Sequence, residues 1–373
     1  MCKPSISIVL PVFNGEDYID SSIKSIQNQS YEDFECIIVN DASVDNTIKL
    51  VEQITEGDKR FLVINNKKNM GLPRSLNIGF RHARGMYLTW TSDDNFFLSN
   101  AFRDMKEYLD CNPSIPMVCA NAIRINQNGQ FLEEINSYND KEICFVNCVG
   151  ACFMYRNEVK NVIGRYNEDL MLIEDYDYWL RILKHYGEIG HLDKILYLYR
   201  SHGKSLSATR QTEIEKKHTQ LLLSNFDWIF AKLKNEPDLL TRVYFKIIQS
   251  NDISGDYLER LSDSVPEVRC DNYYSSNDKY IIFGAGKLGS KIHQIMDGNA
   301  VAFADSNPQK WGKEKEGLVI LSPQEAMKRN EQYPILIGIS EKHAYEVMHM
   351  LYENNSRFFC TWVNYKHNIN KGM

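Results

Sequence analysis

Apolar runs alternate with amphipathic segments through residues 1–100. The run Phe34–Val39 is continuously apolar after Glu35, as in a parallel strand that is buried on both faces. The segment Tyr18–Ile26 instead places apolar residues three and four apart, as on one face of a helix. Strands that alternate with helices in this way predict an α/β fold with a mostly parallel central sheet. The predicted strands are 5–12, 34–39, 61–64 and 86–90, and the predicted helices are 18–26, 45–54 and 73–83.

The pattern continues differently after residue 110. Residues 117–126 predict a strand that Asn128-Gly129 turns into a hairpin, and 174–182 and 196–200 predict an amphipathic helix and another strand. Apolar residues then recur at helical spacing from 210 to 265. The length of 373 residues suggests two or three domains. We predict a first α/β domain over 1–208, a helical connector and linker over 209–277, and a second, small α/β domain over 278–373.

Polar clusters follow four of the predicted strands at their carboxyl ends. Ligands of open α/β sheets bind outside these ends, so the clusters predict one binding crevice. Two of its acids, Asp93 and Asp94, directly follow a buried-looking strand, and Mg²⁺ takes oxygen ligands from carboxylates and substrate phosphates. They predict a metal site; the alternative is that they cap the following helix. The four clusters are Pro11–Asn14, Asp41, Asn69–Arg74 and Asp93-Asp94.

Other candidate residues have two interpretations each. Glu174 and Asp175 begin a predicted helix, where acids favour the helix dipole, but a carboxylate there is also a candidate general base. His202 lies in a polar loop and is either a ligand or solvated. Gly150 interrupts an apolar segment, which indicates either a close approach of the backbone or a bulge. Gly85 follows the third predicted helix and suits its C′ position.

A glycine-rich loop opens the last part of the chain. Gly284, Gly286 and Gly289 follow a strand at 279–283 and precede a helix, and Asp305 ends the next strand. This GxGxxG setting is typical of a nucleotide site. Only one such strand–helix–strand unit is expected in the remaining residues, so the alternative is a module used for packing or dimerisation.

Composition narrows the class of partner. Lys and Arg number 43 against 49 Asp and Glu, giving −6, and the absence of a long basic run makes nucleic acid an unfavoured partner. No signal peptide or membrane-length apolar run is recognised. The nine cysteines include no CxxC pair, which disfavours structural zinc and redox motifs and favours the reducing cytoplasm.

Six segments resemble, in the expected order, motifs of the family 2 glycosyltransferases, which have a GT-A fold. They span about residues 1–205 and are Ser7–Asn14, Val39–Thr47, Asn69–Leu72, Trp90–Asp94, Ile173–Arg181 and Tyr199–His202. The resemblance implies inverting transfer of a sugar from a nucleotide-diphospho-sugar, with UDP favoured, and a Mg²⁺ or Mn²⁺ cofactor. The implied acceptor is a glycan or a lipid-linked hydroxyl. Peripheral association with the inner face of the membrane and a homo-oligomer are both compatible with this interpretation.

The resemblance also assigns roles to single residues. Pro11 and Phe13 would border the base, Asp41 would hydrogen-bond it, and Arg74 would face the nucleotide or its phosphates. Asp93 would reach the metal, and His202 the metal or the diphosphate. Thr91 stands where an acid is common, and a hydroxyl is a weaker ligand. Asp175, with Glu174, matches the catalytic base. The predicted nucleotide-sugar site also includes Asn14, Asn69 and Gly150.

Two further features bear on the reaction. The Gln-x-x-Arg-Trp signature of processive synthases is missing after Asp175, where Trp179-Leu180-Arg181 stands, so transfer of a single sugar is favoured. Residues 279–373 resemble Rossmann-like accessory modules of carbohydrate enzymes. The alternatives are an NAD(P)-dependent sugar-modifying oxidoreductase that acts through Gly284–Gly289, and a sugar-nucleotide sensor without catalysis. The oxidoreductase lacks an evident Tyr-x-x-x-Lys arrangement beside that loop.

Overall fold

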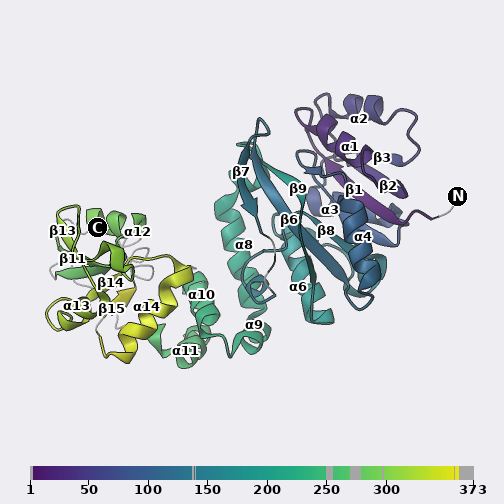
Figure 1. The fold of residues 1–373 in the computed structure, drawn as a ribbon. Helices are drawn as coiled ribbons and strands as arrows, with labels where there is room; N and C mark the ends of the chain where they lie inside the picture. Colours follow the sequence, from purple (N-terminus) through teal and green to yellow (C-terminus); the bar gives the residue numbers. More distant parts are fainter. Residues whose placement is uncertain are drawn as a thin grey trace. The chain divides into compact units, whose positions relative to one another are not determined.

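The computed structural model describes residues 3–136, 138, 140–248, 255–268, 279–295, 298–356 and 358–360. The chain forms two compact units, residues 1–221 (unit 1) and 222–373 (unit 2). The boundary lies inside helix α8 (Gln211–Ser224), where the sequence had suggested a connector from 209 to 277. Figure 1 labels the helices and strands of both units.

Unit 1 contains a nine-stranded sheet within the described residues, ordered β3-β2-β1-β4-β8-β6-β9-β5, with β7 paired to β6. The first four strands are parallel neighbours, whereas β8 runs antiparallel between β4 and β6. The predicted parallel sheet is therefore present, but β8 makes it mixed. The strands are β1 (Ile6–Val12), β2 (Phe34–Asn40), β3 (Phe61–Asn65), β4 (Tyr87–Trp90), β5 (Phe96–Phe97), β6 (Met117–Asn126), β7 (Phe131–Ile135), β8 (Phe153–Arg156) and β9 (Gly190–Ser201).

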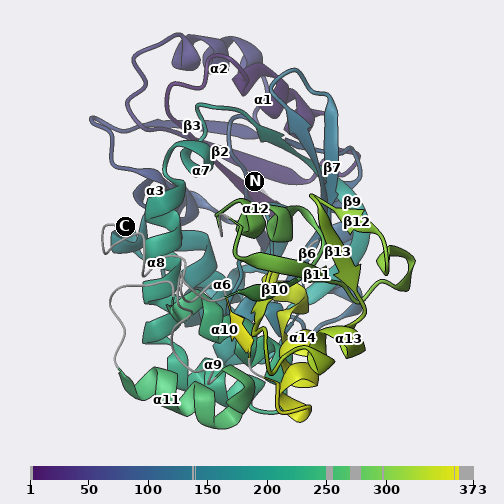
Figure 2. The same ribbon diagram turned by 90° about the vertical axis from the view of Figure 1, so that its left-hand side faces the viewer.

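Helices of unit 1 cover this sheet because their apolar faces match its buried strands. Every residue of β1 and β2 is buried, as the continuous apolar runs predict. Helix α3 packs on β1 and β2, and α4 packs on β6, β8 and β9; Figure 2 gives a second view. The helices are α1 (Ile19–Gln27), α2 (Thr47–Thr55), α3 (Leu72–His82), α4 (Ala101–Cys111), α5 (Asn157–Ile163), α6 (Glu174–Tyr186) and α7 (Leu206–Thr209), with 3-10 helices η1 (Glu142–Cys144) and η2 (Glu168–Leu170).

Gly85 corrects one prediction from the sequence. Helix α3 ends at His82, and Gly85 is not among the glycines with a positive φ, so it is not a left-handed C′ residue. A Cβ built on Gly85 would lie 2.6 Å from the backbone nitrogen of Ser7. Glycine is therefore required because the chain passes close to β1.

Unit 2 is richer in strands than the sequence predicted. Within the described residues its sheet has six strands in the order β12-β13-β11-β10-β14-β15, all parallel except β12 at the edge. The prediction of a single strand–helix–strand unit was wrong, because short strands after Leu318 lack a long apolar run. The strands are β10 (Tyr280–Phe283), β11 (Ala300–Ala304), β12 (Glu314–Lys315), β13 (Leu318–Leu321), β14 (Ile335–Ile337) and β15 (Phe358–Cys360).

The helices of unit 2 confirm the helical periodicity after residue 210. They are α9 (Phe226–Leu233), α10 (Pro237–Ile248), α11 (Gly255–Ser264), α12 (Lys287–Ile295), α13 (Pro323–Lys328) and α14 (Glu341–Glu353), with 3-10 helices η3 (Pro266–Val268) and η4 (Pro308–Lys310). Across the described parts of both units, no helix is both long enough and apolar enough to span a bilayer.

Candidate active site

The carboxyl ends of β1, β2 and β4 meet at one edge of the sheet of unit 1, since these strands are parallel neighbours in register. Pro11 lies within β1, and Phe13 and Asn14 directly follow it. The backbone amide of Asn14 donates to Ser43 Oγ (3.0 Å), and Asn14 Oδ1 accepts from the amide of Val44 (2.9 Å). These bonds tie the loop after β1 to the loop after β2. Phe13 is 47% exposed, so its ring is available to a ligand.

Asp41, at the end of β2, organises the loop between β3 and α3. Its Oδ1 accepts from the amide of Met70 and from Asn66 Nδ2, and its Oδ2 accepts from the amide of Gly71, each at 2.8 Å. Asn69 Oδ1 also accepts from the Gly71 amide, at 3.1 Å. The carboxylate thus braces the loop that carries Asn69. The sequence pattern did not predict this bracing.

Arg74 has a carboxylate partner within the protein, and its predicted contact with the nucleotide stays a prediction. Its Nε lies 2.7 Å from Glu168 Oε2, and the side chain is 48% exposed. Glu168 Oε1 also accepts from Asn77 Nδ2 at 3.2 Å, so α3 is joined to η2. A contact of Arg74 with a nucleotide would require it to leave or share Glu168.

The surroundings of Asp93 disfavour the charged form of its carboxyl group. Burial, and then the negative charge of Asp94, raise its pKa to about 7, against the lowering effect of the Phe13 amide. A Cβ built on Gly15 would lie 1.9 Å from Asp93 Oδ2, so only glycine allows the loop to pass this carboxylate. No ion pair to Asp93 occurs within the described residues. A cation beside Asp93 would stabilise the charged form of this carboxyl group.

Thr91 is directed away from a metal role. Its Oγ1 lies 2.5 Å from the hydroxyl of Tyr197 on β9, and both residues are buried. The hydroxyl that replaces the common acid of this motif is therefore hydrogen-bonded to a residue of β9.

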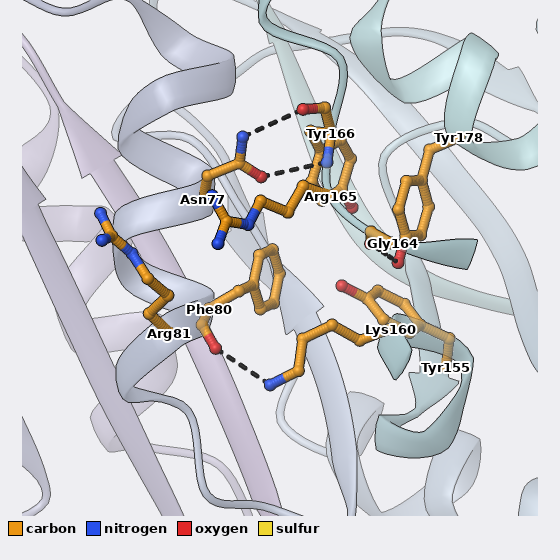
Figure 3. A pocket seen from close by; sticks show the side chains of 9 residues that line it. All are labelled: Asn77, Phe80, Arg81, Tyr155, Lys160, Gly164, Arg165, Tyr166 and Tyr178. Carbon is orange, nitrogen blue, oxygen red and sulfur yellow. Dashed lines mark hydrogen bonds between the residues drawn. The ribbon is translucent and has the colours of Figure 1, made fainter. Parts of the chain in front are cut away.

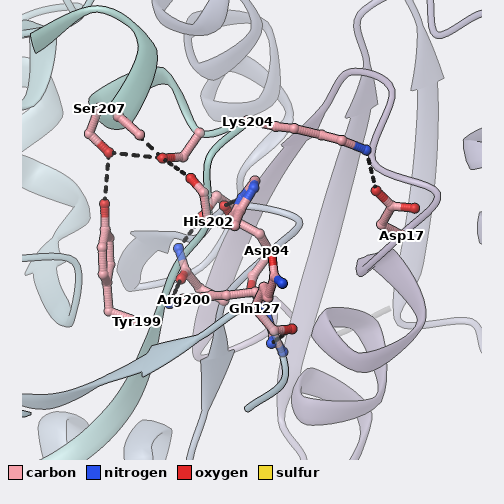
Figure 4. Close-up of polar contacts among 12 residues, drawn as sticks. Asp17, Asp94, Gln127, Tyr199, Arg200, His202, Lys204 and Ser207 are labelled. Atoms are coloured by element: carbon pink, nitrogen blue, oxygen red, sulfur yellow. Dashed lines mark hydrogen bonds and ion pairs between the residues drawn. The ribbon is translucent and has the colours of Figure 1, made fainter. Parts of the chain in front are cut away.

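Asp94 and His202 form a second polar group at this edge, drawn in Figure 4. His202 Nε2 lies 2.9 Å from Asp94 Oδ2, and its ring packs against Tyr18 at 5.2 Å between centroids. Ser92 Oγ donates to Asp94 Oδ1 at 2.6 Å. His202 therefore contacts Asp94, the neighbour of Asp93, and its approach to a metal or a diphosphate stays a prediction.

Arg200 holds this group in place, and the sequence analysis did not single it out. It is 6% exposed, and it donates to the carbonyls of Asp94 (3.1 Å), Asn126 (3.2 Å) and Gln127 (2.8 Å). Its guanidinium lies over the rings of Tyr18 (4.5 Å) and Phe96 (4.9 Å). An arginine at the end of a predicted strand, two residues before the candidate ligand His202, was the available signal.

Glu174 and Asp175 open α6, and their carboxyl groups have different surroundings. Asp175 Oδ2 accepts from Asn147 Nδ2 at 2.9 Å, and Oδ1 accepts from the Tyr176 amide at 2.7 Å. Glu174 is 3% exposed, and its Oε2 has no hydrogen-bond partner within the described residues. Burial and the neighbouring Asp175 raise the pKa of Glu174 to about 8, while burial raises the pKa of Asp175. At neutral pH, Glu174 and Asp175 together therefore carry fewer than two negative charges.

The backbone before α6 is strained. Leu172 has a φ of 85°, an uncommon conformation for a residue with a bulky side chain. Such strain persists where surrounding contacts hold it and gathers at functional sites. Here it precedes the two acids by two and three residues.

Tyr166 links the acids of α6 to the strand-end acids. Trp90, the last residue of β4, donates from Nε1 to the Tyr166 hydroxyl at 3.1 Å. The charge of Asp175 is close enough to Tyr166 to contribute to the rise in the pKa of that phenol. A Cβ built on Gly71 would lie 3.5 Å from Met171 Sδ. Met171, which lies shortly before α6, therefore approaches the loop that Asp41 braces.

Gly150 lies in the loop between Asn147 and β8. Its φ is 73°, so it takes a left-handed conformation that favours glycine. The structure places it near the segment that holds Asp175, and its predicted contact with the sugar nucleotide stays a prediction.

The glycine-rich loop of unit 2 makes mainly internal contacts. Gly284 has a φ of 117°, and a Cβ on Gly289 would lie 1.8 Å from the Gly284 carbonyl oxygen. Asp305 accepts from the Ala285 amide (2.9 Å), the Asn307 amide (2.9 Å) and Lys310 Nζ (2.8 Å). Lys315 Nζ donates to the carbonyls of Ala285 and Gly286, both at 3.1 Å.

These bonds occupy the Asp305 carboxylate, which the sequence offered as a ribose ligand, and Gly286 alone of the three glycines has open space around it. A nucleotide site at Gly284, Gly286, Gly289 and Asp305 stays a prediction, because a ribose would have to compete with Lys310 and two backbone amides.

Acids at the carboxyl ends of parallel strands, with a further carboxylate at the start of a neighbouring helix, are typical of α/β enzymes that bind a phosphorylated ligand. The comparisons with known proteins agree with this class. Residues 7–164 match the model "Glycosyl transferase family 2". Residues 7–164 of unit 1 are therefore similar to the family 2 glycosyltransferases.

Curated relatives extend this similarity beyond the matched segment. An uncharacterized glycosyltransferase of Haemophilus influenzae is 27% identical over 294 residues, which cover 75% of this chain and 88% of the relative. An uncharacterized glycosyltransferase of Methanocaldococcus jannaschii is 28% identical over 254 residues, or 66% of this chain and 85% of the relative. The crystal structure of S. aureus TarS 1-349 is 18% identical with a TM-score of 0.49, covering 70% of this chain and 84% of that one. That structural likeness is too distant to carry an argument about substrate.

Proposed function

We propose that unit 1 transfers one sugar from a UDP-sugar to a hydroxyl of a glycan or lipid-linked acceptor, with inversion at the anomeric carbon. The observation that carries the proposal is the arrangement of Asp175. At the start of α6 its carboxylate is held by Asn147, and burial raises its pKa, while Asp93 follows the end of β4. One acid is thus available on the acceptor side and another on the leaving-group side.

Asp175 is the proposed general base. A sugar hydroxyl is a poor nucleophile at neutral pH, so a carboxylate that takes its proton during attack contributes about 10²–10⁴-fold in rate. A raised pKa makes Asp175 a stronger base when it is ionised. Glu174, with a pKa of about 8, is mostly neutral at pH 7 and leaves the negative charge on Asp175.

The nucleotide is proposed to lie along the loops after β1 and β2. Exposed Phe13 offers a ring face to the base, and Asn14 and Asp41 shape the two loops around it. The Met70–Gly71 backbone, braced by Asp41, forms the neighbouring wall. Asn69, Arg74 and Gly150 are proposed ligands of the diphosphate or the sugar.

Asp93 fits a divalent cation, Mg²⁺ or Mn²⁺. The described residues contain no group of three or more His, Cys, Asp or Glu side chains that could hold a metal alone. Cations that bind nucleoside diphosphates take one or two protein carboxylates together with phosphate oxygens, so Asp93 with support from Asp94 and His202 suffices. When bound, the cation neutralises the charge that grows on the leaving diphosphate.

The test compares Asp175→Asn with the wild type and with Asp169→Asn, an exposed neighbour on η2. Nucleotide sugars are first screened for thermal stabilisation and slow hydrolysis to identify the donor. Asp175→Asn should bind UDP with unchanged affinity while turnover falls by about 10²-fold or more. Asp169→Asn should behave like the wild type. Wild-type turnover in Asp175→Asn would remove it from the base role, and NMR of the first product anomer decides between inversion and retention.

A further inference from the structure

Unit 1 contains a pocket whose lining residues include none of the acids described above. Its volume is about 360 Å³, and it lies between α3, α5, α6, β8 and the loop 164–166. Figure 3 shows the side chains that line it. The proposed transfer reaction assigns no nucleotide-binding or sugar-binding role to the residues that line this pocket.

The floor of the pocket is aromatic. Tyr166 lies between Phe80 and Tyr178, with ring centroids 5.7 and 4.3 Å away and ring planes inclined by 16° and 15°. Tyr155 adds a fourth ring, 5.7 Å from Tyr178. Hydrogen bonds between Asn77 and the backbone of Tyr166, both at 3.0 Å, fix this floor to α3. Stacking and burial make this floor rigid, since none of the four rings is more than 4% exposed.

The rim of the pocket is cationic. Of the nine lining residues, Arg81, Lys160 and Arg165 are basic and none is acidic. Lys160 and Arg165 extend across the pocket toward α3 from the opposite wall (Figure 3). Lys160 Nζ donates to the Phe80 carbonyl at 3.1 Å. No ion pair holds the side chain of Lys160 or Arg165 within the described residues.

Two acids on or beside the elements that line the pocket are engaged in ion pairs. Glu168 pairs with Arg74 and is also within range of the charge of Arg165. Asp177 pairs with Arg181 at 2.8 Å. Burial lowers the pKa of Lys160, which reflects a cation that is partly removed from water without a carboxylate to compensate. Arg81 lies in the last turn of α3, where a cation is favourable in any case. Lys160 and Arg165, by contrast, come from α5 and a loop.

We propose that this pocket binds an organic phosphate, with the phosphate between Lys160 and Arg165 and the organic part on the aromatic floor. Arginine and lysine form strong charge-assisted hydrogen bonds with phosphate oxygens. The binding itself does not depend on the proposed function. Tyr166 nevertheless contributes to both the pocket and the proposed transfer site, since its hydroxyl contacts Trp90 at the end of β4. A molecule bound in the pocket would therefore pack against a residue that the two sites share.

Calorimetric titration of the full chain tests the proposal, with phenyl phosphate, geranyl phosphate and inorganic phosphate as probes and UDP present at saturation. We expect at least one organic phosphate to saturate a single site, and inorganic phosphate to bind about tenfold more weakly or worse because it lacks the apolar part. Tighter binding of geranyl phosphate would identify a lipid phosphate as the natural class, and tighter binding of phenyl phosphate a soluble aromatic one. Either result supports the proposal.

Variants separate this site from the transfer site. Arg165→Gln is exposed and should fold normally, and both it and Lys160→Gln should weaken the organic phosphate by about tenfold or more. UDP affinity should stay unchanged in both, and Arg103→Gln, an arginine on α4, is the matched control. Competition by UDP, equal binding of inorganic phosphate, no saturable binding, or unaltered affinity in both variants would overturn the proposal. If the wild type does not bind UDP, that result counts against the proposed function instead.

Discussion

Replacing Glu174 with glutamine should change the pH dependence of the stability of unit 1. Glu174 is 3% exposed, and one of its carboxyl oxygens lacks a hydrogen-bond partner within the described residues. Burial, then the charge of Asp175, raise its pKa from the ordinary value of 4.5 to about 8, against the effect of Lys217. The folded protein therefore keeps a proton on Glu174 that the unfolded chain releases.

The direction of the effect follows from proton linkage. Between pH 4.5 and about 8 the folded state binds more protons at this position, so stability falls as pH rises through this window. One proton changes the free energy of unfolding by at most about 1.4 kcal/mol per pH unit. Because glutamine has no proton to lose, Glu174→Gln should gain about 1 kcal/mol relative to the wild type at pH 5.5 and about 4 kcal/mol at pH 7.5.

Urea unfolding of the wild type and Glu174→Gln across this range measures the difference. Trp90 and Trp179 report on unit 1, and signals from unit 2 are common to both proteins. Glu158→Gln, an exposed glutamate on α5, should run parallel to the wild type at every pH. Parallel curves for Glu174→Gln as well would refute the reasoning, because Glu174 would then be ionised in the folded state.

Three other substitutions test the strand-end group. Asp93→Asn should weaken Mn²⁺-dependent UDP binding by about tenfold or more. Calorimetry on this variant should then give the same UDP affinity with and without excess chelator. Thr91→Val should leave the metal dependence of UDP binding intact, while the free energy of unfolding falls by about 1–3 kcal/mol because the buried Tyr197 hydroxyl loses its partner; a metal defect would contradict this hydrogen-bonding role. Arg200→Met should reduce the free energy of unfolding by about 2–4 kcal/mol and weaken UDP binding, since three carbonyls lose their donor; unchanged urea midpoints would contradict this.

The positions of the site acids were predictable because parallel strands end at a common edge. Asp41 and Asp93 follow apolar runs that are long enough to identify as strands, and β1, β2 and β4 are neighbours in register. Only local patterns and one topological rule were needed. The same reasoning failed for the short strands of unit 2, such as β14 (Ile335–Ile337), whose three residues carry no readable period.

Local patterns and this topological rule could not predict which side chains contact each other across the sheet. Thr91 meets Tyr197 at a sequence separation of 106, and Arg74 meets Glu168 at a separation of 94. Neither contact follows from the spacing of residues, because each depends on the order of strands and on the loop that crosses between them. Gly85 belongs with them, since its requirement comes from Ser7 on another strand.

The two acids at the start of α6 show how tertiary contacts divide roles that sequence leaves equal. Both stand in a first helical turn, where the dipole favours negative charge, and both were candidates for the base. The strained backbone at Leu172 and the amide of Asn147 then set them apart: Asp175 is bound and oriented, whereas Glu174 is buried without a full set of partners. Two ionised carboxylates side by side would repel each other, and the neutral Glu174 removes that repulsion near pH 7. The asymmetry of the pair therefore supports Asp175 as the base by the same physics that makes Glu174 a poor one.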